Sequence, residues 1–318
     1  MERLDLEALV AARGDWDRQV DLTRGTDHWS SGSDWAFSTH AIWGTGPEVV
    51  LRSSDGLAAF GRLSMDGADA LVGLDPIWAF ASPIVGAHPR PLAVDVADVL
   101  NDEAGWDLVF LTGLVAESPL DTACIEAFGR RHSLFAGPEA VRLVADVSDI
   151  DRWWADRGDK FRRNIRRARR YADGEGLIVE VVDGWEPSAL MGRLLSVEEH
   201  SWKGREESGL LGGEMAEFYT AMAGPLQASG RLRAAVALID GIDVGFILGA
   251  VRGDTYRGLQ VSFSGGYESF SVGHLLQDHE LHRVARSGIT RYDLGMDMPY
   301  KHHWSSTTEE TRTVIVRR

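Results

Sequence analysis

The sequence has 318 residues, of which 44% are hydrophobic and 25% are charged. This composition excludes a disordered chain, and the length exceeds one average hydrophobic core, so we predict two globular domains. The formal net charge of −15 argues against general nucleic-acid binding and against DNA as a partner, but leaves room for a local basic groove.

Disulfide-rich and membrane-spanning proteins are also excluded. The single cysteine, Cys124, permits no disulfide framework and no cysteine cluster for zinc or iron and sulfur. No run approaches the roughly 18 apolar residues of a membrane span, and residues 1–10 lack the basic and apolar pattern of an export signal. We therefore expect a cytoplasmic protein without an integral membrane segment.

The first half of the chain combines short helical and strand-like segments in an acidic sequence. Residues 1–150 contain 10 basic and 24 acidic side chains, whereas residues 151–318 contain 23 and 24. In chain order we predict a helix over 4–20, a Trp-, Ser- and Gly-rich segment over 26–46, strands over 48–53, 57–64 and 70–74, a helix over 94–101, a strand over 106–111 and a helix over 118–132. This half shows no catalytic signature, so any anion-facing potential belongs to the second half.

The second half is more regular, because each element ends at a turn signal. The predicted elements are a helix over 151–171, a strand over 177–182, helices over 186–202 and 215–229, strands over 232–239, 244–251 and 255–263, a helix over 272–287, and strands over 290–294 and 311–316. Asp240-Gly241 and Gly253-Asp254 lie between consecutive strands, as hairpin turns do. Both halves together predict a mixed α+β fold.

The order of these elements, with a helix directly after the fourth strand, resembles the GCN5-related N-acyltransferase (GNAT) fold. The matching residues are Tyr267-Glu268, Ser271-Val272-Gly273, Leu275-Leu276 and the segment Asp293–Trp304 with its Tyr300-Lys301-His302-His303-Trp304. They resemble the CelD/BcsL type of GNAT, which has a Ser-Pro-Gly turn before the helix and a Tyr-Lys-x-x-Trp segment near the end. The sequence departs from that type at Val272, where the family has proline.

The motif match covers about residues 155–318 and implies tandem GNAT-like domains, each with a central mixed sheet flanked by helices. Residues 1–150 would form a degenerate N-terminal domain with an acceptor or structural role. Residues 151–318 would form the domain for donor binding and catalysis. Tandem GNAT domains are also similar to the Fem family of aminoacyl-tRNA-dependent ligases, although a shared fold does not by itself establish function.

Lysine is rare in this chain, which has only Lys160, Lys203 and Lys301 beside 30 arginines. The compact ammonium of lysine has a pKa that burial can shift, so a lysine in such a background is a candidate for chemistry. Acyl transfer to an amine requires stabilisation of an oxyanion, and Lys301 between the aromatic residues Tyr300 and Trp304 suits that role. Fem ligases have a lysine in a similar aromatic segment, which implies the same role here. In the alternative interpretation, the two aromatic residues belong to the core and Lys301 points to solvent.

A donor site is predicted at the start of the helix over 272–287, because a helix N-terminus presents unpaired N–H groups that suit a phosphate. Ser271 would cap the helix and bind an anion, Gly273 would admit the ligand, and Val272 and His274 belong to the same turn. In GNAT enzymes this turn binds the pyrophosphate of coenzyme A, so the resemblance implies acyl-CoA as co-substrate. Capping and packing alone are the alternative.

Seven of the eleven residues in 160–170 are basic, and the apolar residues between them recur at helical spacing. Arg163, Arg166, Arg167 and Arg170 share one face of this helix. We assign Arg166 and Arg170 to a phosphate-rich partner, which would be the ribose phosphate of CoA, a nucleotide sugar, a tRNA acceptor stem or an anionic membrane surface. The alternative is a solvated face that opposes the acidic first half.

Acceptor binding is assigned to residues near the end of an earlier helix and to aromatic residues beside the motifs. These candidates are Glu199, Trp202, Lys203, Tyr267 and Trp304. Asp297 is our first choice as general base, followed by Glu199 or His200, since each lies near the lysine segments. We expect no metal, because His274, His279 and His282 lack a ligand-pair spacing and a cysteine partner.

The sequence therefore predicts an N-acyltransferase that moves an acyl group from acyl-CoA to an amine of a sugar, a peptide or a small metabolite. One alternative is a Fem-like ligase that uses aminoacyl-tRNA, which the tandem arrangement, the short turn before residue 272 and the basic helix favour. Another alternative is a non-catalytic binding protein in polysaccharide production.

Overall fold

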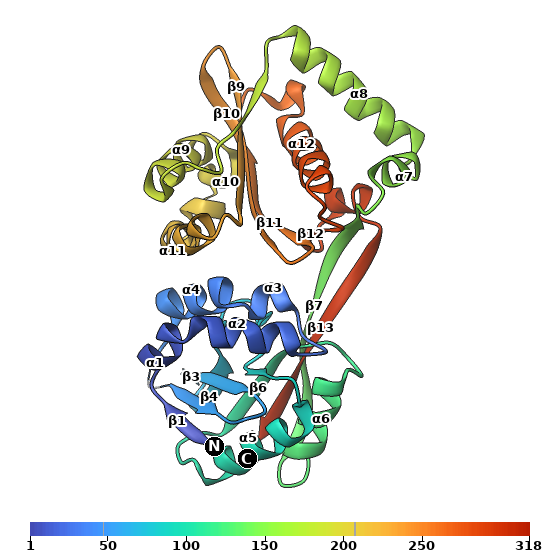
Figure 1. Cartoon of the computed structure of the whole chain (residues 1–318). Helices are drawn as coiled ribbons and strands as arrows, with labels where there is room; N and C mark the ends of the chain where they lie inside the picture. The colour runs from blue at the N-terminus through green and yellow to red at the C-terminus, as the bar shows by residue number, and fades with distance from the viewer. Residues whose placement is uncertain (47, 207) are drawn as a thin grey trace. The chain divides into compact units, whose positions relative to one another are not determined.

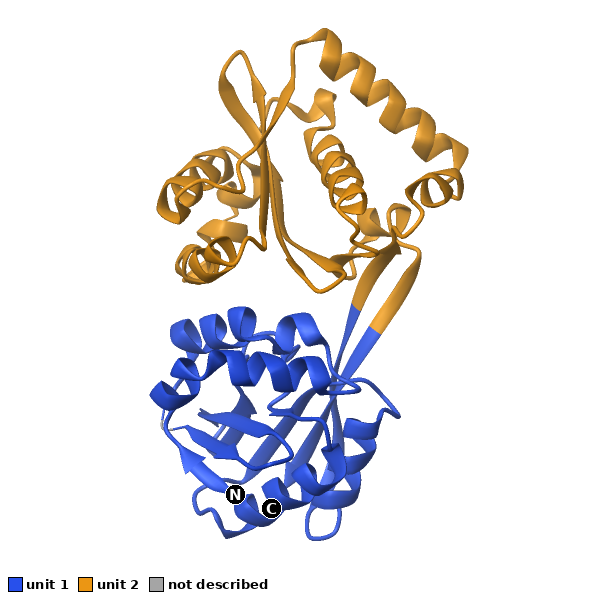
Figure 2. Ribbon diagram, viewed as in Figure 1, with its two compact units in different colours: residues 1–141, 310–318 blue, residues 142–309 orange. Residues whose placement is uncertain are grey.

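The computed structural model describes residues 1–46, 48–206 and 208–318. The chain forms two compact units, shown in Figure 2: unit 1 comprises residues 1–141 and 310–318, and unit 2 comprises residues 142–309. The sequence placed the border at residue 150 and assigned the closing strand over 311–316 to the second domain. In the structure, residues 310–318 belong to unit 1 because they pair with a strand of that unit.

Unit 1 contains a mixed sheet flanked by helices. Its helices are α1 (Leu6–Ala11), α2 (Arg13–Leu22), α3 (His28–Ser31), α4 (Ser33–Trp43), α5 (Pro89–Asp102) and α6 (Pro119–Phe128). Its strands are β1 (Glu2–Leu4), β2 (Val49–Arg52), β3 (Leu57–Met65), β4 (Ala68–Gly73), β5 (Ile84–Val85) and β6 (Leu108–Leu114). Unit 1 also contains residues up to 141 of β7 (Ser133–Asp146) and residues from 310 onward of β13 (Thr307–Arg317). The order β1-β2-β3-β4-β6-β13 is antiparallel except for the parallel pair β4–β6.

Local signals explain where several of these helices begin. Asp5 caps α1 by accepting a hydrogen bond from the N–H of Ala8 at 2.7 Å, and Ser118 caps α6. Prolines occupy the first turns of α5 and α6, where a missing N–H costs nothing. The helix predicted over 4–20 is divided at Ala12, which separates α1 from α2.

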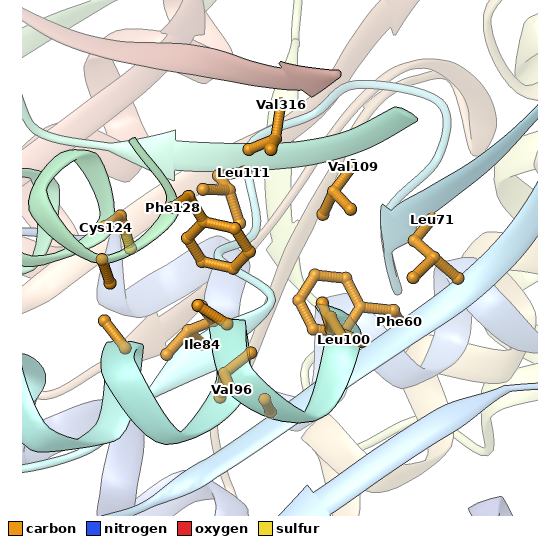
Figure 3. Close-up of a cluster of buried hydrophobic side chains, with 14 of the residues drawn as sticks. Phe60, Leu71, Ile84, Val96, Leu100, Val109, Leu111, Cys124, Phe128 and Val316 are labelled. Atoms are coloured by element: carbon orange, nitrogen blue, oxygen red, sulfur yellow. The ribbon is translucent and has the colours of Figure 1, made fainter. Parts of the chain in front are cut away.

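The core of unit 1 lies between its sheet and helices α5 and α6, as Figure 3 shows. Phe60 and Leu71 on the sheet face Val96 and Leu100 on α5, and all four side chains are buried. Cys124 on α6 is fully buried in the same cluster, where it acts as a small apolar residue.

A segment between β4 and β5 lies against the end of β6. Thr112 Oγ1 donates a hydrogen bond to the carbonyl of Ala81 at 2.5 Å, and a Cβ at Gly113 would lie 2.3 Å from the carbonyl oxygen of Phe80. Gly113 also has a φ of +63°, which glycine adopts without strain. The residues around Ala81 therefore fill the space beside β6 in unit 1.

Unit 2 contains a second mixed sheet with helices on both faces, as Figure 1 shows. Its helices are α7 (Ile150–Ala155), α8 (Asp159–Gly174), α9 (Pro187–Glu199), α10 (Trp202–Arg205), α11 (Met215–Ala228) and α12 (Val272–Arg286), with short 3-10 helices η1 (Gly209–Leu211), η2 (Glu268–Phe270) and η3 (Pro299–His303). Its own strands are β8 (Ile178–Val181), β9 (Leu232–Ile239), β10 (Ile242–Arg252), β11 (Thr255–Phe263) and β12 (Arg291–Met296). Helices α9, α10 and α11 cover one face, and α12 with α8 outside it covers the other.

The strand order in unit 2 is β7-β12-β11-β10-β9-β8, and only β11 and β12 are parallel. The mixed sheets confirm the predicted fold class. The helix predicted over 151–171 is interrupted before Asp159, and the helix predicted over 186–202 ends at Glu199. Helix α4 and strand β7 were not predicted.

None of the helices within the described ranges combines the length and the apolar character that a membrane crossing requires.

Candidate active site

The parallel strands β11 and β12 pair only at their first residues. Residues 255–257 of β11 are aligned with residues 291–293 of β12, and no pair joins the described residues beyond them. A register shift in β11 between Gly258 and Gln260, seen in its pairing with β10, bends the strand where the pairing with β12 ends. Residues 258–261 and 294–296 thus lie beyond the pairing of the two strands, and we call this unpaired region the β11–β12 opening.

Backbone atoms line part of this opening. Gly295 has a φ of +79°, and a Cβ there would lie 3.7 Å from both the carbonyl oxygen of Gly258 and Nζ of Lys301. Without a side chain at Gly295, the Lys301 ammonium lies directly beside the strand end.

Lys301, on η3, has a strongly perturbed environment. Its Nζ donates a hydrogen bond to the carbonyl of Met296 at 3.0 Å and lies 5.8 Å from the ring centroid of Tyr300. Its pKa is lowered to about 8, chiefly by burial; Asp293 opposes this shift, and Lys203 and Arg257 add to it. The ammonium therefore loses its proton far more readily than an exposed lysine does.

The end of β12 is anchored by a buried ionic cluster. Asp293 accepts hydrogen bonds from Arg142 at 2.9 Å and from the N–H of Gly295 at 2.7 Å, and it forms an ion pair with Arg257 at 2.9 Å. All three charged side chains are almost completely buried. Asp293 therefore holds the strands on both sides of it, with three of its roughly four acceptor positions occupied.

Lys203, on α10, reaches the same opening from the helical layer. Its Nζ donates hydrogen bonds to Gln260 Oε1 and to the carbonyl of Val261, both at 2.9 Å. Gln260 in turn donates to the hydroxyl of Tyr219 on α11 at 3.0 Å. Burial lowers the pKa of Lys203 and raises that of Tyr219 to about 12. Lys203 is also among the cations that lower the pKa of Lys301.

A cavity of about 1020 Å³ lies between α8, the start of α12 and η3. Cationic side chains and histidines line much of it: Arg157, Lys160, Arg167, His274, His302 and His303. The rings of Phe161 and Tyr171 and the hydroxyl of Ser271 also face it. Burial and the neighbouring His303 lower the pKa of His274. The cavity can hold a ligand that combines phosphates with planar or apolar groups.

The start of α12 differs in part from the prediction. Ser271 is in the N-cap position, but its φ is +55° and its side chain makes no capping hydrogen bond. Val272 is fully buried, and a Cβ at Gly273 would lie 3.4 Å from the ring of Phe263, so both residues pack against the sheet. Ser271 and His274 are the two residues of this turn that line the cavity.

Helix α8 presents its predicted arginine face to solvent, because Ile165, Ala168 and Ala172 form its buried face. Arg166 lies over the ring of Trp154 at 5.9 Å, and Arg170 is exposed. Neither lines the cavity, which is bordered on this helix by Lys160 and Arg167. If Arg166 and Arg170 bind phosphates, they therefore do so on the solvent-exposed face of the helix and not in the cavity.

The remaining predicted residues are spread over different environments. Trp304 is completely buried, with its ring 4.9 Å from that of Phe161, so it supports the cavity wall from the core and cannot contact an acceptor directly. Tyr267 packs against Phe270 at 5.9 Å. Trp202 and Tyr300 are half-exposed, and burial raises the pKa of Tyr300.

The candidate bases are all close to the surface. Asp297 forms an exposed ion pair with His302 at 2.7 Å and is among the groups that act on Lys301. Glu199 and His200 are exposed, and Nδ1 of His200 donates a hydrogen bond to the carbonyl of Ser196 at 2.9 Å. Of these three, Asp297 is the one whose charge is felt at Lys301.

Sequence reasoning missed three residues that complete the surroundings of Lys203: Glu198, Tyr219 and Gln260. Glu198 is fully buried, accepts a hydrogen bond from the N–H of Leu210 at 3.1 Å and acts on the charge of Lys203. The sequence shows two neighbouring glutamates, Glu198 and Glu199, and this pair was the available signal. Which of the two side chains points inward depends on the rotation of the helix about its axis. Within the described ranges, no group of three His, Cys, Asp or Glu side chains is arranged to hold a metal ion.

Comparisons with known proteins agree with this architecture. Residues 159–302 match the acetyltransferase (GNAT) domain family. No curated protein matches the sequence significantly. The solved structure of FemX has a TM-score of 0.68 at 12% identity, covering 98% of this chain and 97% of FemX. The C-terminal domain of a protein from Agrobacterium fabrum, assigned as a lysylphosphatidylglycerol synthetase, has a TM-score of 0.61 at 14% identity, covering 97% and 92%. At these identities the likeness to both structures establishes the fold.

Proposed function

Because the chain belongs to the GNAT superfamily, we propose that it transfers an acyl group from an acyl-CoA thioester to the amine of a sugar, a peptide or a small metabolite. The observation that carries the proposal is the β11–β12 opening, where two lysines with lowered pKa values lie beside unpaired strand ends. We assign donor binding and catalysis to unit 2, and an acceptor-related or structural role to unit 1. A CelD/BcsL-type enzyme acting in the cytoplasm is part of the same proposal.

In the proposed reaction, the neutral amine attacks the thioester carbonyl, and the new C–N bond displaces the carbonyl π electrons onto oxygen. The tetrahedral intermediate then collapses, re-forms the C=O bond and breaks the C–S bond. The released thiolate takes up a proton, and the nitrogen loses one. Asp297 is our candidate to accept that proton, directly or through water.

Lys301 is the candidate that stabilises the oxyanion. Its ammonium has three protons, of which one is donated to the carbonyl of Met296, so two remain for a ligand. With a pKa of about 8, roughly nine tenths of the side chain is protonated at pH 7. A hydrogen bond from a partly desolvated cation to developing negative charge is a strong form of transition-state stabilisation.

The phosphate end of the donor fits the cavity between α8, α12 and η3. Arg157, Lys160 and Arg167 supply positive charge, and the start of α12 points backbone N–H groups at the same region. In this arrangement, Ser271 and His274 would contact the donor, whereas Val272 and Gly273 would hold the turn against the sheet.

A second candidate is aminoacyl transfer from aminoacyl-tRNA, as in the Fem ligases that the sequence resembles. The specific observation in its favour is the exposed face of α8, where Arg163, Arg166 and Arg170 are solvent-exposed and do not line the cavity. Such a face suits the regularly spaced phosphates of an RNA strand.

The test is the melting temperature with CoA, with acetyl-CoA and with longer acyl-CoAs. A ligand at a hundred times its Kd adds about 2.7 kcal/mol of stability, so a clear upward shift is expected. The matched control is Arg167→Ala, which removes a cation from the cavity and should diminish the shift. No shift with any thioester, together with stabilisation by aminoacyl-tRNA, would replace the first candidate by the second.

A further inference from the structure

We propose that the acceptor carries an anionic group, a carboxylate or a phosphate, in addition to its amine, and that Lys203 binds this group at the β11–β12 opening. The inference rests on the proposed function for the identity of the opening as a reaction site. The hydrogen bonds and charges around Lys203 are observed independently of the proposed function. We use them to infer a property of the acceptor, and not of the donor.

Lys203 has hydrogen-bonding capacity left over. Its two observed acceptors, Gln260 Oε1 and the carbonyl of Val261, account for two of the three ammonium protons. Both acceptors lie on β11 at the border of the opening. The position of Gln260 is fixed by its own hydrogen bond to Tyr219, so the lysine is held by a pre-formed polar network.

Both acceptors are also neutral groups. No carboxylate of the described residues forms an ion pair with its Nζ. Glu198 is the carboxylate that acts on it, but the oxygens of Glu198 accept hydrogen bonds from Ser201 Oγ at 3.3 Å and from the N–H of Leu210. A buried ammonium without a contacting anion is unfavourable, and burial accordingly lowers the pKa of Lys203. An anionic ligand would relieve this cost.

The second lysine strengthens the argument. Lys203 and Arg257 both lower the pKa of Lys301, so the opening brings like charges together. The carboxylate of Asp293 is already engaged by Arg142, Arg257 and the N–H of Gly295. An acceptor with an amine and an anionic group can place the anion at Lys203, while the nearby cations favour the neutral, nucleophilic form of its amine.

The first experiment compares matched acceptors that differ only in the anionic group. L-Lysine is paired with 1,5-diaminopentane, L-alanine with ethylamine, and glucosamine 6-phosphate with glucosamine, which also separates carboxylate from phosphate. We expect the anionic member of at least one pair to be preferred at least tenfold in kcat/KM. Equal use of both members in every pair that reacts would overturn the proposal.

The variants Lys203→Met and Lys203→Arg then identify the residue. In Lys203→Met, the KM of the preferred anionic acceptor should rise at least tenfold, while its kcat and the KM of the donor change little. Lys203→Arg keeps the charge and should retain part of the preference. A purely structural lysine would instead weaken anionic and neutral acceptors alike, which would contradict the proposal.

Anion binding can also be measured without turnover, which separates this inference from the proposed function. With three lysines in the chain, lysine-selective NMR gives three side-chain signals, assigned through Lys160→Met, Lys203→Met and Lys301→Met. Inorganic phosphate or acetate should shift the Lys203 signal and raise the pKa of Lys301 in wild type and in Arg167→Ala, but not in Lys203→Met. An unchanged Lys203 signal with both anions would refute the site, even if acyl transfer occurs.

Discussion

The two units have the same order of elements around their sheets, but they differ at the pair of parallel strands. In both, three antiparallel strands lead to a helix and then to a strand that runs parallel to the third: β4 pairs with β6 in unit 1, and β11 with β12 in unit 2. In unit 2 the parallel strands separate and leave the opening with Lys203 and Lys301. In unit 1 the residues around Ala81 fill the corresponding space, and Thr112 binds them.

A buried carboxylate holds this filling segment of unit 1 in place. Asp75 accepts hydrogen bonds from the indole of Trp35 at 2.9 Å and from the N–H groups of Trp78 and Phe80 at 3.0 and 3.1 Å. Burial raises the pKa of Asp75. The same strand pattern therefore has two lysines with lowered pKa values beside it in unit 2, and a segment of the chain against it in unit 1.

We expect that removing a positive charge at the β11–β12 opening of unit 2 lowers kcat, and that removing one from the surface of unit 1 does not. Lys301→Met should lower kcat by about 100- to 1000-fold, or about 2.7–4 kcal/mol, as for loss of one oxyanion donor. Arg90→Met, an exposed cation of unit 1, should leave kcat unchanged. Steady-state kinetics with circular dichroism as a folding check measures both. If Lys301→Met retained full activity in a folded protein, the lysine would have no part in the mechanism.

The free energy of unfolding should depend on the buried carboxylate that holds the filling segment of unit 1. In Asp75→Asn the amide nitrogen would face N–H donors, which should cost about 1–3 kcal/mol of the free energy of unfolding. Asp98→Asn changes an exposed carboxylate of the same unit and should cost less than about 0.5 kcal/mol. Urea unfolding followed by tryptophan fluorescence gives both values. Equal stabilities for the two variants would show that Asp75 does not hold the segment.

The smallest predicted effect is a pH dependence that originates in unit 2. Burial sets the pKa of Lys301 at about 8, and only its protonated form can donate to the oxyanion. At saturating acceptor, kcat should therefore be insensitive to Lys301 below pH 8 and fall about tenfold per pH unit above it. Lys301→Arg, which stays charged, should remove this fall. A kcat that rises through pH 8 would instead make Lys301 a general base.

Much of unit 2 could be predicted from sequence because turn residues separate its elements. Asp240-Gly241 and Gly253-Asp254 divide β9, β10 and β11 close to their observed limits. Helix α4 was missed because Ser38, Thr39 and His40 are buried there, so polar residues occupy inward positions and the apolar period is lost. Strand β7 was missed because its first half is exposed and contains Gly137 and Pro138, which are rare inside strands.

Composition singled out candidate site residues, whose roles stay predictions, and it gave no sign of contacts that depend on packing. The rarity of lysine pointed to Lys203 and Lys301, whose lowered pKa values the structure now explains. Gln260 and Tyr219 gave no sequence signal, because their meeting depends on a strand and a helix separated by 41 positions. Glu198 and Glu199 differ by one helical step, which turns one inward and the other to solvent.

The discontinuity of unit 1 affects the order in which the protein becomes structured during synthesis. Strand β13, which lies between β6 and β7 in the strand order, pairs with β6 through Ile315 and Phe110. This inner strand is supplied only by the last residues of unit 1 to leave the ribosome. Unit 2 is encoded entirely by residues 142–309 and can assemble earlier. The nascent chain would then carry a folded unit 2 while unit 1 still lacks strand β13. The unpaired edge of β6 would be a place for chaperone binding or mispairing.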